Sequence, residues 1–316
     1  MGGGTYDTAA TRRLVSDAHS TGRSYMRHSA AIAAGTAART VHPKLDAKAL
    51  NRTGVRIRES RDHPDHPNSV AVAVIFDTTG SMRRLPEQFV EKLPDLMDLI
   101  KTKGYLADPQ ILFGAVNDAT THCITPLEIG QFESGNQMDD VITNIILQGG
   151  GGDGVTESYE LLMYFMARHT ALDCLEKRGK KGYLFIIGDE IPYDSVSAEE
   201  VRRWIGDEIQ SDIPTATIVA ELKRKFDVYW LFPDAAANAG SVTARDTLEG
   251  YFGQNLIHLR SAADVSKVIA ATIGIHEGRN PRDVARELAE ADTTVTASAM
   301  DALVAAVPPR RLDDDL

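Results

Sequence analysis

The sequence predicts a doubly wound α/β fold, in which a mostly parallel sheet is covered by helices on both faces. From residue 70 onward, short apolar runs alternate with longer segments that have helical periodicity. The run at 70–76 is continuously apolar, as in a central strand that is buried on both sides. With 316 residues, 43% of them apolar, the chain can bury a substantial core.

The strands are expected at apolar runs that end in polar or glycine-containing turns. They are placed at 70–76, 110–116, 122–127, 183–187, 227–232 and 255–259. The second and third are expected to form a hairpin, because Asn117-Asp118-Ala119-Thr120 reads as a turn between them. Helices are expected at 85–100 with a kink at Pro94, and at 137–147, 158–166, 198–209, 215–224 and 262–273. This order corresponds to a Rossmann-like sheet.

Two terminal extensions flank the predicted domain at 69–275. The basic N-terminal arm, 1–68, has eleven Arg or Lys against six Asp or Glu, which leaves +5 there and −16 in the remainder. Because its positive charges are scattered and no RNA-binding aromatic pattern accompanies them, nucleic-acid binding is unlikely and the arm is expected to dock on its own body or a neighbouring subunit. One helix is expected through 9–36. The C-terminal helical tail, 276–316, has a helix at 281–291, an apolar patch at 300–307 and an acidic end at 313–315.

A cytoplasmic protein is the expected class. No stretch approaches the roughly 20 consecutive apolar residues that cross a bilayer, and the first residues lack the apolar core of a signal peptide. The two cysteines, Cys123 and Cys174, form neither a metal-ligand cluster nor a disulfide framework, so we expect two small, buried, reduced thiols.

Oxygen-bearing side chains follow the strands at three places. They are Asp77-Thr78-Thr79-Gly80-Ser81, the glycine run at 149–152 with Asp153 and Thr156, and Asp189-Glu190. In parallel α/β sheets ligands bind at the carboxyl ends of the strands, so these groups are expected to meet. Hydroxyls and carboxylates suit a hard cation such as Mg²⁺ or Mn²⁺, and the absence of His and Cys from the set argues against zinc.

This pattern resembles the metal-ion-dependent adhesion site of von Willebrand factor A (vWA) domains. The signature of that family is Asp-x-Ser/Thr-x-Ser after the first strand, a Thr or Asp in a glycine-rich second loop, and an Asp after the fourth strand. Asp77, Thr79 and Ser81 match the first element, and Asp189 matches the last. The resemblance covers roughly 69–275 and implies that the hydroxyls bind the metal directly, while the aspartates act mainly through water.

The second loop departs from the commonest form of the family, which has Thr after two glycines. Here four glycines precede Asp153, as in a Gly-Gly-Asp variant that is followed by Glu at the helix start, and Glu157 fits that position. The spacing from Asp153 to Glu157 is one residue longer than in that variant. Thr156 therefore remains an alternative to Asp153 as the ligand from this loop.

The resemblance implies a binding module, not an enzyme. In such domains the open position of the metal takes a carboxylate from a protein partner. Bacterial cytosolic domains of this kind commonly act beside AAA+ ATPases, so an ATPase is the implied partner. Arg83 and Arg84, directly after the signature, are either contacts for an acidic partner or ordinary exposed arginines at a helix start, and the second interpretation is the expected one.

Asp77-Thr78-Thr79-Gly80-Ser81 also resembles the Asp-x-Thr-Gly-Thr motif of haloacid dehalogenase-type phosphotransferases. In that alternative Asp77 is a nucleophile that forms an aspartyl-phosphate, beside Mg²⁺. Such an enzyme needs a lysine, for which the candidates are Lys177, Lys180 and Lys181. It leaves the glycine run with Asp153 unexplained. A third interpretation is a vestigial site in which Asp77 only caps the following turn.

Overall fold

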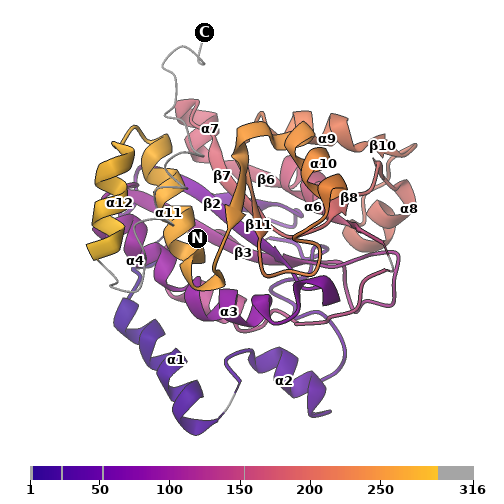
Figure 1. Cartoon of the computed structure of the whole chain (residues 1–316), viewed down its shortest axis with the longest axis horizontal. Helices are drawn as coiled ribbons and strands as arrows, with labels where there is room; N and C mark the ends of the chain where they lie inside the picture. Colours follow the sequence, from indigo (N-terminus) through magenta and orange to yellow (C-terminus); the bar gives the residue numbers. More distant parts are fainter. Residues whose placement is uncertain (1–2, 23, 52, 153, 291–316) are drawn as a thin grey trace.

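A six-stranded sheet forms the centre of the protein (Figure 1). The computed structural model describes residues 3–22, 24–51, 53–152 and 154–290. The strand order is β12-β11-β7-β2-β3-β4, and all neighbours are parallel except β3 and β4. The bounds are β2 Ser69–Asp77, β3 Asp108–Val116, β4 Leu127–Ile129, β7 Gly182–Ile187, β11 Phe226–Pro233 and β12 Leu256–Leu259. The protein is therefore a mixed α/β protein with a mostly parallel central sheet.

Five of the six predicted strands lie within two residues of their expected bounds, whereas the predicted strand at 122–127 is wrong. The chain does return to pair with β3 as expected, but the pairing strand is β4, which begins only at Leu127. The reason is a side chain: Gln148 accepts from the backbone N–H of Ile124 at 2.6 Å and donates to the carbonyl of Thr125 at 2.7 Å. These bonds satisfy backbone groups that a strand would have used for its ladder.

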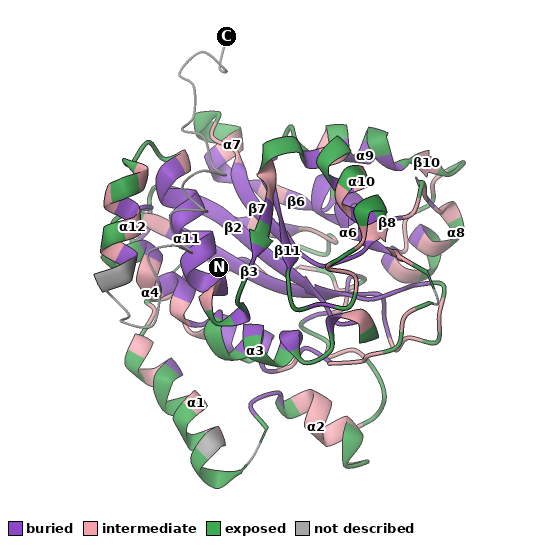
Figure 2. Cartoon of the chain, in the orientation of Figure 1, coloured by how far each residue is buried: buried purple, intermediate pink, exposed green. Residues whose placement is uncertain are grey.

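Alternate residues of β2 belong to two separate apolar cores. Val72, Val74 and Phe76 pack with one set of helices, and Ala73 and Ile75 pack with another. Figure 2 shows the central strands buried and the outer helices exposed on one side. The first core includes residues of α3 Leu85–Lys92, α4 Asp95–Thr102, α5 Gln137–Ile142, α11 Val265–His276 and α12 Pro281–Glu290; the second includes residues of α6 Tyr159–Arg168, α7 Asp173–Arg178, α9 Thr215–Leu222 and α10 Val242–Phe252. A strand buried on both faces explains the unbroken apolar run in the sequence.

Several predicted helices are shorter or divided. Pro94 separates α3 from α4 instead of kinking one helix, because proline cannot donate the backbone hydrogen bond that would continue α3. The segment 137–147 is helical only in α5, and 198–209 only in α8 Ala198–Glu200 and the π-helical turn η2 Val201–Ile205. The short 3-10 turns are η1 Gly80–Met82, η3 Gly253–Asn255 and η4 Ala262–Asp264.

The helix α10 and six short strands were not expected. Exposed Val242 at the start of α10 and Gly250 in its interior obscure the amphipathic pattern, although Ser241 caps the helix by accepting from the N–H of Ala244 at 3.1 Å. The short strands are β1 Arg58–Ser60 with β6 Thr170–Leu172, β5 Thr156–Glu157 with β8 Ile191–Pro192, and β9 Ser195–Val196 with β10 Ile213–Pro214.

The N-terminal arm folds onto its own body, which is one of the two alternatives expected for it. It contains two helices, α1 Thr8–Thr21 and α2 Arg27–Ala33, instead of one through 9–36, and both are drawn below the sheet in Figure 1. Among the contacts that hold it, the Tyr6 hydroxyl donates to the carbonyl of Pro94 at 2.6 Å. The C-terminal tail is described through α12; its apolar patch at 300–307 and acidic end at 313–315 lie outside the described residues.

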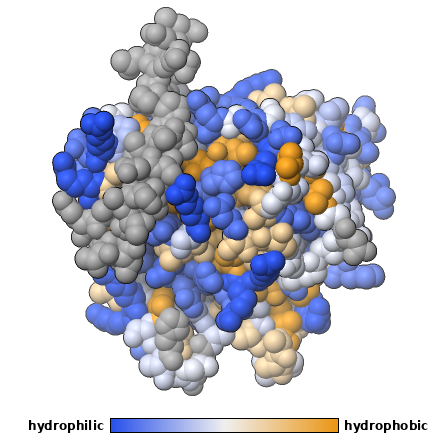
Figure 3. Space-filling view, viewed as in Figure 1, coloured by the Kyte–Doolittle hydropathy of each residue, from blue (hydrophilic) through white to orange (hydrophobic). Residues whose placement is uncertain are grey.

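In the described part of the chain, no helix is long and apolar enough to span a bilayer. Hydrophilic side chains cover much of the face shown in Figure 3, and hydrophobic residues show through in small areas between them. Both cysteines are free thiols, as expected, but only Cys174 is buried and Cys123 is partly accessible.

Candidate metal centre

Asp77 is the last residue of β2 and is fully buried. Its Oδ1 accepts from the backbone N–H of Thr79 at 2.6 Å, and its Oδ2 accepts from the Tyr159 hydroxyl at 2.6 Å. The first bond closes the turn that leaves the strand, and the second comes from the first turn of α6. Both oxygens of this carboxylate are therefore held in place by donors.

The turn after β2 places two hydroxyls next to each other. The Oγ atoms of Thr79 and Ser81 lie 3.2 Å apart, and Ser81 donates to Asp189 Oδ1 at 2.7 Å. Thr79 is buried, whereas Ser81 is partly accessible. Ser81 thus lies at the solvent side of the group.

The glycine run lies directly against this turn. Gly149, Gly150 and Gly151 all have positive φ, at 62°, 77° and 102°, a conformation that side-chain-bearing residues rarely adopt. Two backbone hydrogen bonds join the glycine run to the turn. The N–H of Gly80 donates to the Gly150 carbonyl at 2.7 Å, and the N–H of Gly149 donates to the Thr78 carbonyl at 2.9 Å. The glycine run therefore approaches the Asp77–Ser81 turn closely, backbone against backbone.

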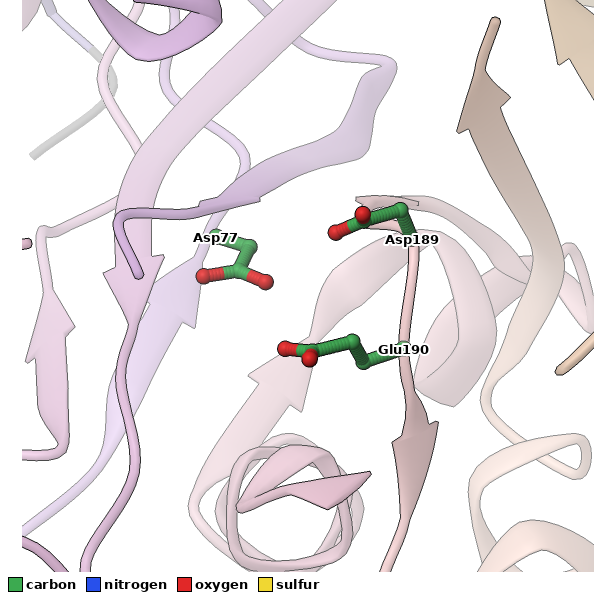
Figure 4. A group of neighbouring side chains, drawn as sticks. All are labelled: Asp77, Asp189 and Glu190. Atoms are coloured by element: carbon green, nitrogen blue, oxygen red, sulfur yellow. The ribbon is translucent and has the colours of Figure 1, made fainter. Parts of the chain in front are cut away.

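Asp189 and Glu190 follow β7, the neighbour of β2 in the sheet. With Asp77 they form a group in which one carboxylate oxygen from each residue lies within 4.8 Å of the others. Figure 4 shows the three carboxylates turned toward a common space between the two strand ends. All three side chains are buried, so the group is a preformed concentration of negative charge.

Burial and mutual repulsion shift the acid–base equilibria of this group. Burial is the main cause that raises the pKa of Asp77 to about 7, although the Tyr159 and Thr79 bonds oppose it. Burial also raises the pKa of Glu157, with the charge of Asp77 as the next cause, and it raises the pKa of Glu190. A site that resists carrying several negative charges gains stability from a bound cation.

The donor set fits a hard divalent cation. Mg²⁺ lies 2.0–2.1 Å from its oxygen ligands, so the oxygens around one ion are separated by about 3–4 Å. The Thr79–Ser81 separation of 3.2 Å is of this size, and the Ser81–Asp189 separation of 2.7 Å is slightly shorter, as expected for a direct hydrogen bond. Nitrogen and sulfur ligands are absent from the described members of the group.

The predicted residues divide into three classes. The structure brings Asp77, Thr79, Ser81 and Asp189 together. Thr156 lies in β5, beside β8, and its hydroxyl interacts with the Tyr193 phenol; among the described contacts no hydrogen bond joins it to the group. Asp153 lies outside the described residues.

Sequence reasoning missed two residues that hold the carboxylates. Tyr159 is one, and Asn238 in the loop between β11 and α10 is the other. Its backbone N–H donates to Asp189 Oδ2 at 2.8 Å and its Nδ2 donates to Glu190 Oε1 at 3.1 Å. Tyr159 lies seven residues after Gly152, the last residue of the glycine run, and it begins α6, so its position at the start of a predicted helix was a usable signal. Nothing in DAAANAGS pointed to Asn238.

The lysines required by the phosphotransferase alternative lie at the other end of β7. Lys180 pairs with Glu277 at 2.5 Å, Lys177 pairs with Asp173 at 2.7 Å, and Lys181 lies 3.8 Å from Asp227. They precede β7, whereas Asp189 follows it. They are therefore engaged at the amino end of the strand, opposite the carboxylate group.

Parts of some solved structures resemble this chain at low sequence identity. No family model and no curated protein matches the sequence. Among solved structures, a pilus adhesin, SpaC, from Lactobacillus rhamnosus GG is similar over 69% of this chain and 31% of the adhesin, with 10% identity and a TM-score of 0.47. Proximal thread matrix protein 1 from the mussel byssus is similar over 65% of this chain and 47% of that protein, with 11% identity and a TM-score of 0.41. This chain thus matches about a third to a half of those proteins, and likenesses at this level carry no functional argument.

Proposed function

We propose that this protein is a metal-dependent binding module of the vWA kind, with a doubly wound, Rossmann-like sheet. In this proposal Thr79 and Ser81 bind Mg²⁺ or Mn²⁺ through their hydroxyls, and Asp77 and Asp189 supply charge around it. The ion provides an electrophilic coordination position, and a carboxylate from a protein partner occupies it.

One observation carries the proposal. Two adjacent hydroxyls from the end of β2 meet a carboxylate from the end of β7 at hydrogen-bonding distances, with Ser81 Oγ only 2.7 Å from Asp189 Oδ1. The glycine run supports the same turn from a third segment. A capping role for Asp77 alone accounts for its bond to Thr79, but it does not account for buried Asp189 and Glu190 beside it.

Phosphoryl transfer is the weaker alternative. A nucleophilic Asp77 needs an oxygen that can reach a phosphorus atom, but this carboxylate is fully buried and each of its oxygens accepts a hydrogen bond. The lysines available for such chemistry lie at the opposite end of β7. Both features favour a binding role over catalysis.

The partner is proposed to present an Asp or Glu side chain, and an AAA+ ATPase in the bacterial cytoplasm is the proposed candidate. Arg83 and Arg84 are exposed beside Ser81. Arg83 has a φ of 55°, and among the described residues it is the non-glycine residue with a positive φ. Such backbone strain is often found at functional sites. An acidic partner segment would gain from both guanidinium groups and from the ion.

Thermal unfolding with and without metal tests the proposal. An ion at 100 times its Kd stabilises the folded state by about 2.7 kcal/mol, which raises the Tm of a protein of this size by about 5 °C. We expect Mn²⁺ to produce this rise in the wild type and Ser81→Ala to abolish it. Ser266→Ala is the control, because the Ser266 hydroxyl also donates a hydrogen bond, but to the carbonyl of Lys92, away from the site.

A wild-type Tm that ignores both Mg²⁺ and Mn²⁺ would contradict the proposal. Capture of partner proteins in the presence of Mn²⁺, but not after chelation, would support the binding role. Hydrolysis of a chromogenic phosphate ester that is lost in Asp77→Asn would instead favour the phosphotransferase alternative.

A further inference from the structure

Glu157 lies in the same buried space as the metal centre but is not one of its three converging carboxylates. Its side chain is 1% exposed, and its Oε2 has no hydrogen-bond partner. Its Oε1 lies against the glycine run, where a Cβ on Gly151 would come within 2.7 Å of it. A buried carboxylate oxygen without a donor is costly, so its presence requires an explanation.

Glu190 connects Glu157 to the metal centre. One oxygen of Glu190 lies 3.4 Å from Ser81 Oγ, and the other accepts from Asn238 Nδ2 at 3.1 Å. The same carboxyl group interacts with the side chain of Glu157. Two carboxyl groups in contact need either a shared proton or a cation between them.

The charge of the whole group exceeds what one divalent ion neutralises. Asp77, Asp189, Glu190 and Glu157 carry up to four negative charges when ionised. Within the described chain, no ion pair joins any of them to a Lys, Arg or His side chain. One Mg²⁺ would leave two buried negative charges without a counter-charge, and such charges cost several kcal/mol each.

We propose that the site binds two divalent cations, the second between Glu157 and Glu190. Glu190 is shared between the two positions, and Glu157 is the residue that distinguishes the second from the first. Two divalent ions balance four carboxylates, and a carboxylate shared by two ions a few ångströms apart is a common arrangement of oxygen ligands. The inference rests on the proposed function, because the second position is completed by a ligand of the first.

Mn²⁺ binding to the full-length, metal-free chain tests this inference. We expect the wild type to bind two Mn²⁺ per chain, and Glu157→Gln to bind one. Electron paramagnetic resonance adds an independent readout: two neighbouring Mn²⁺ ions couple and broaden the spectrum, whereas Glu157→Gln should show the six-line pattern of an isolated ion.

Glu160→Gln is the matched control. Glu160 lies three residues further along the chain, is fully buried and also has an oxygen without a partner, but its other oxygen accepts from the N–H of Tyr193 at 3.0 Å, outside the site. It should retain two coupled ions.

The wild type decides the question even if a variant fails to fold. One Mn²⁺ per chain in the wild type overturns the second site and leaves the proposed function standing. No bound Mn²⁺ in the wild type overturns both. Two ions in both the wild type and Glu157→Gln would remove Glu157 from the second site and overturn the inference as stated.

Discussion

Glu128 in β4 is a buried carboxylate that is not part of the metal centre. Both of its oxygens face the backbone N–H of Ile146, at 3.2 and 3.0 Å. Burial raises the pKa of Glu128 to about 8. In the unfolded chain this group ionises near pH 4.5, so the folded state alone keeps the proton between that pH and about 8.

The consequence is a loss of stability with rising pH. The contribution of Glu128 is fully present below about pH 4.5, declines through the window to about pH 8, and is constant above it. The size is on the order of 5 kcal/mol, at 1.36 kcal/mol per unit of pKa. We expect Glu128→Gln, which cannot ionise, to gain stability relative to the wild type as the pH rises from 5 to 8. Urea unfolding in the presence of a chelator measures this difference.

Glu249→Gln, on the exposed face of α10, is the control and should follow the wild type at every pH. If the unfolding free energies of the wild type and Glu128→Gln run parallel across this range, Glu128 is ionised in the folded protein and the prediction is wrong.

Tyr159 supports Asp77 across a separation of 82 residues. Tyr159→Phe removes a donor to a buried carboxylate, and a hydrogen bond to a charged group contributes about 1.5–3 kcal/mol. We expect Mn²⁺ affinity at pH 7 to fall about tenfold or more, with a smaller loss at pH 9, where Asp77 is ionised even without this donor. Tyr164→Phe is the control, because the Tyr164 hydroxyl, on the same helix as Tyr159, donates to Asp207, which is not part of the metal centre. Equal Mn²⁺ affinity in Tyr159→Phe and the wild type would show that the bond does not tune the site.

At the residue scale, the sequence revealed groups that follow strands and concealed those that reach the site from elsewhere. Asp77 and Asp189 could be predicted because parallel strands end at one edge of the sheet. Asn238 could not be predicted, because it lies 49 residues after Asp189 and reaches it only through the conformation of the loop between β11 and α10. Thr156 illustrates the reverse case: it has the right chemistry and nearly the right spacing, but β5 pairing holds it next to Tyr193.

At the scale of elements, the site depends on two turns that touch through their backbones. A Cβ on Gly80 would lie 2.9 Å from the carbonyl oxygen of Gly150, which is too close for either backbone to remain in place. Gly80→Ala should therefore separate the glycine run from the Asp77–Ser81 turn. We expect the Mn²⁺-induced rise in Tm to fall by more than half, with a smaller change in the Tm of the metal-free protein.

Gly250→Ala serves as the control for this substitution. Gly250 lies in α10 with no atoms near its added Cβ, so the change should stabilise the protein by about 0.5–1 kcal/mol and leave the Mn²⁺ response intact. A normal Mn²⁺ response in Gly80→Ala would mean that the contact between the turns is not needed for the ion.

Elements were predictable where their pattern was set by burial and unpredictable where single side chains replaced backbone bonds. β2 is apolar from Val70 to Phe76 because both its faces are covered. The predicted hairpin strand at 122–127 failed because Gln148 supplies the bonds of Ile124 and Thr125. A long-range side-chain contact of this kind leaves no periodic trace in the sequence.

At the scale of the whole molecule, the basic arm is part of the folded body. Arg27 and Lys44 of the arm pair with Asp140 at 3.0 and 3.5 Å, and Arg12 lies 3.6 Å from Asp98. These side chains are largely exposed, so each pair contributes about 0–1 kcal/mol. The charge asymmetry in the sequence therefore pointed correctly to an acidic surface for the arm, but charge alone is too weak to hold it.

Buried hydrogen bonds under α1 are the stronger anchor. Thr11 is 1% exposed, and its hydroxyl donates to Asp139 Oδ2 at 2.6 Å, beside a 3.0 Å bond from Asn136 Nδ2 to the same oxygen. Thr11→Val keeps the shape of the side chain but removes the donor from a carboxylate whose other oxygen already lacks a partner. The loss should be about 1.5–3 kcal/mol.

Because α1 contributes few residues to the core, this loss should open the arm locally before it unfolds the sheet. We expect trypsin to cleave Thr11→Val at Arg12 and Arg13 at least tenfold faster than the wild type, while the Mn²⁺ response stays unchanged. Ser16→Ala, an exposed change on the same helix, controls for altered helix propensity. Equal cleavage rates in Thr11→Val and the wild type would show that the Asp139 bond does not anchor the arm. A lost Mn²⁺ response would show instead that arm and metal centre are energetically coupled, since no described contact joins Thr11 to the site.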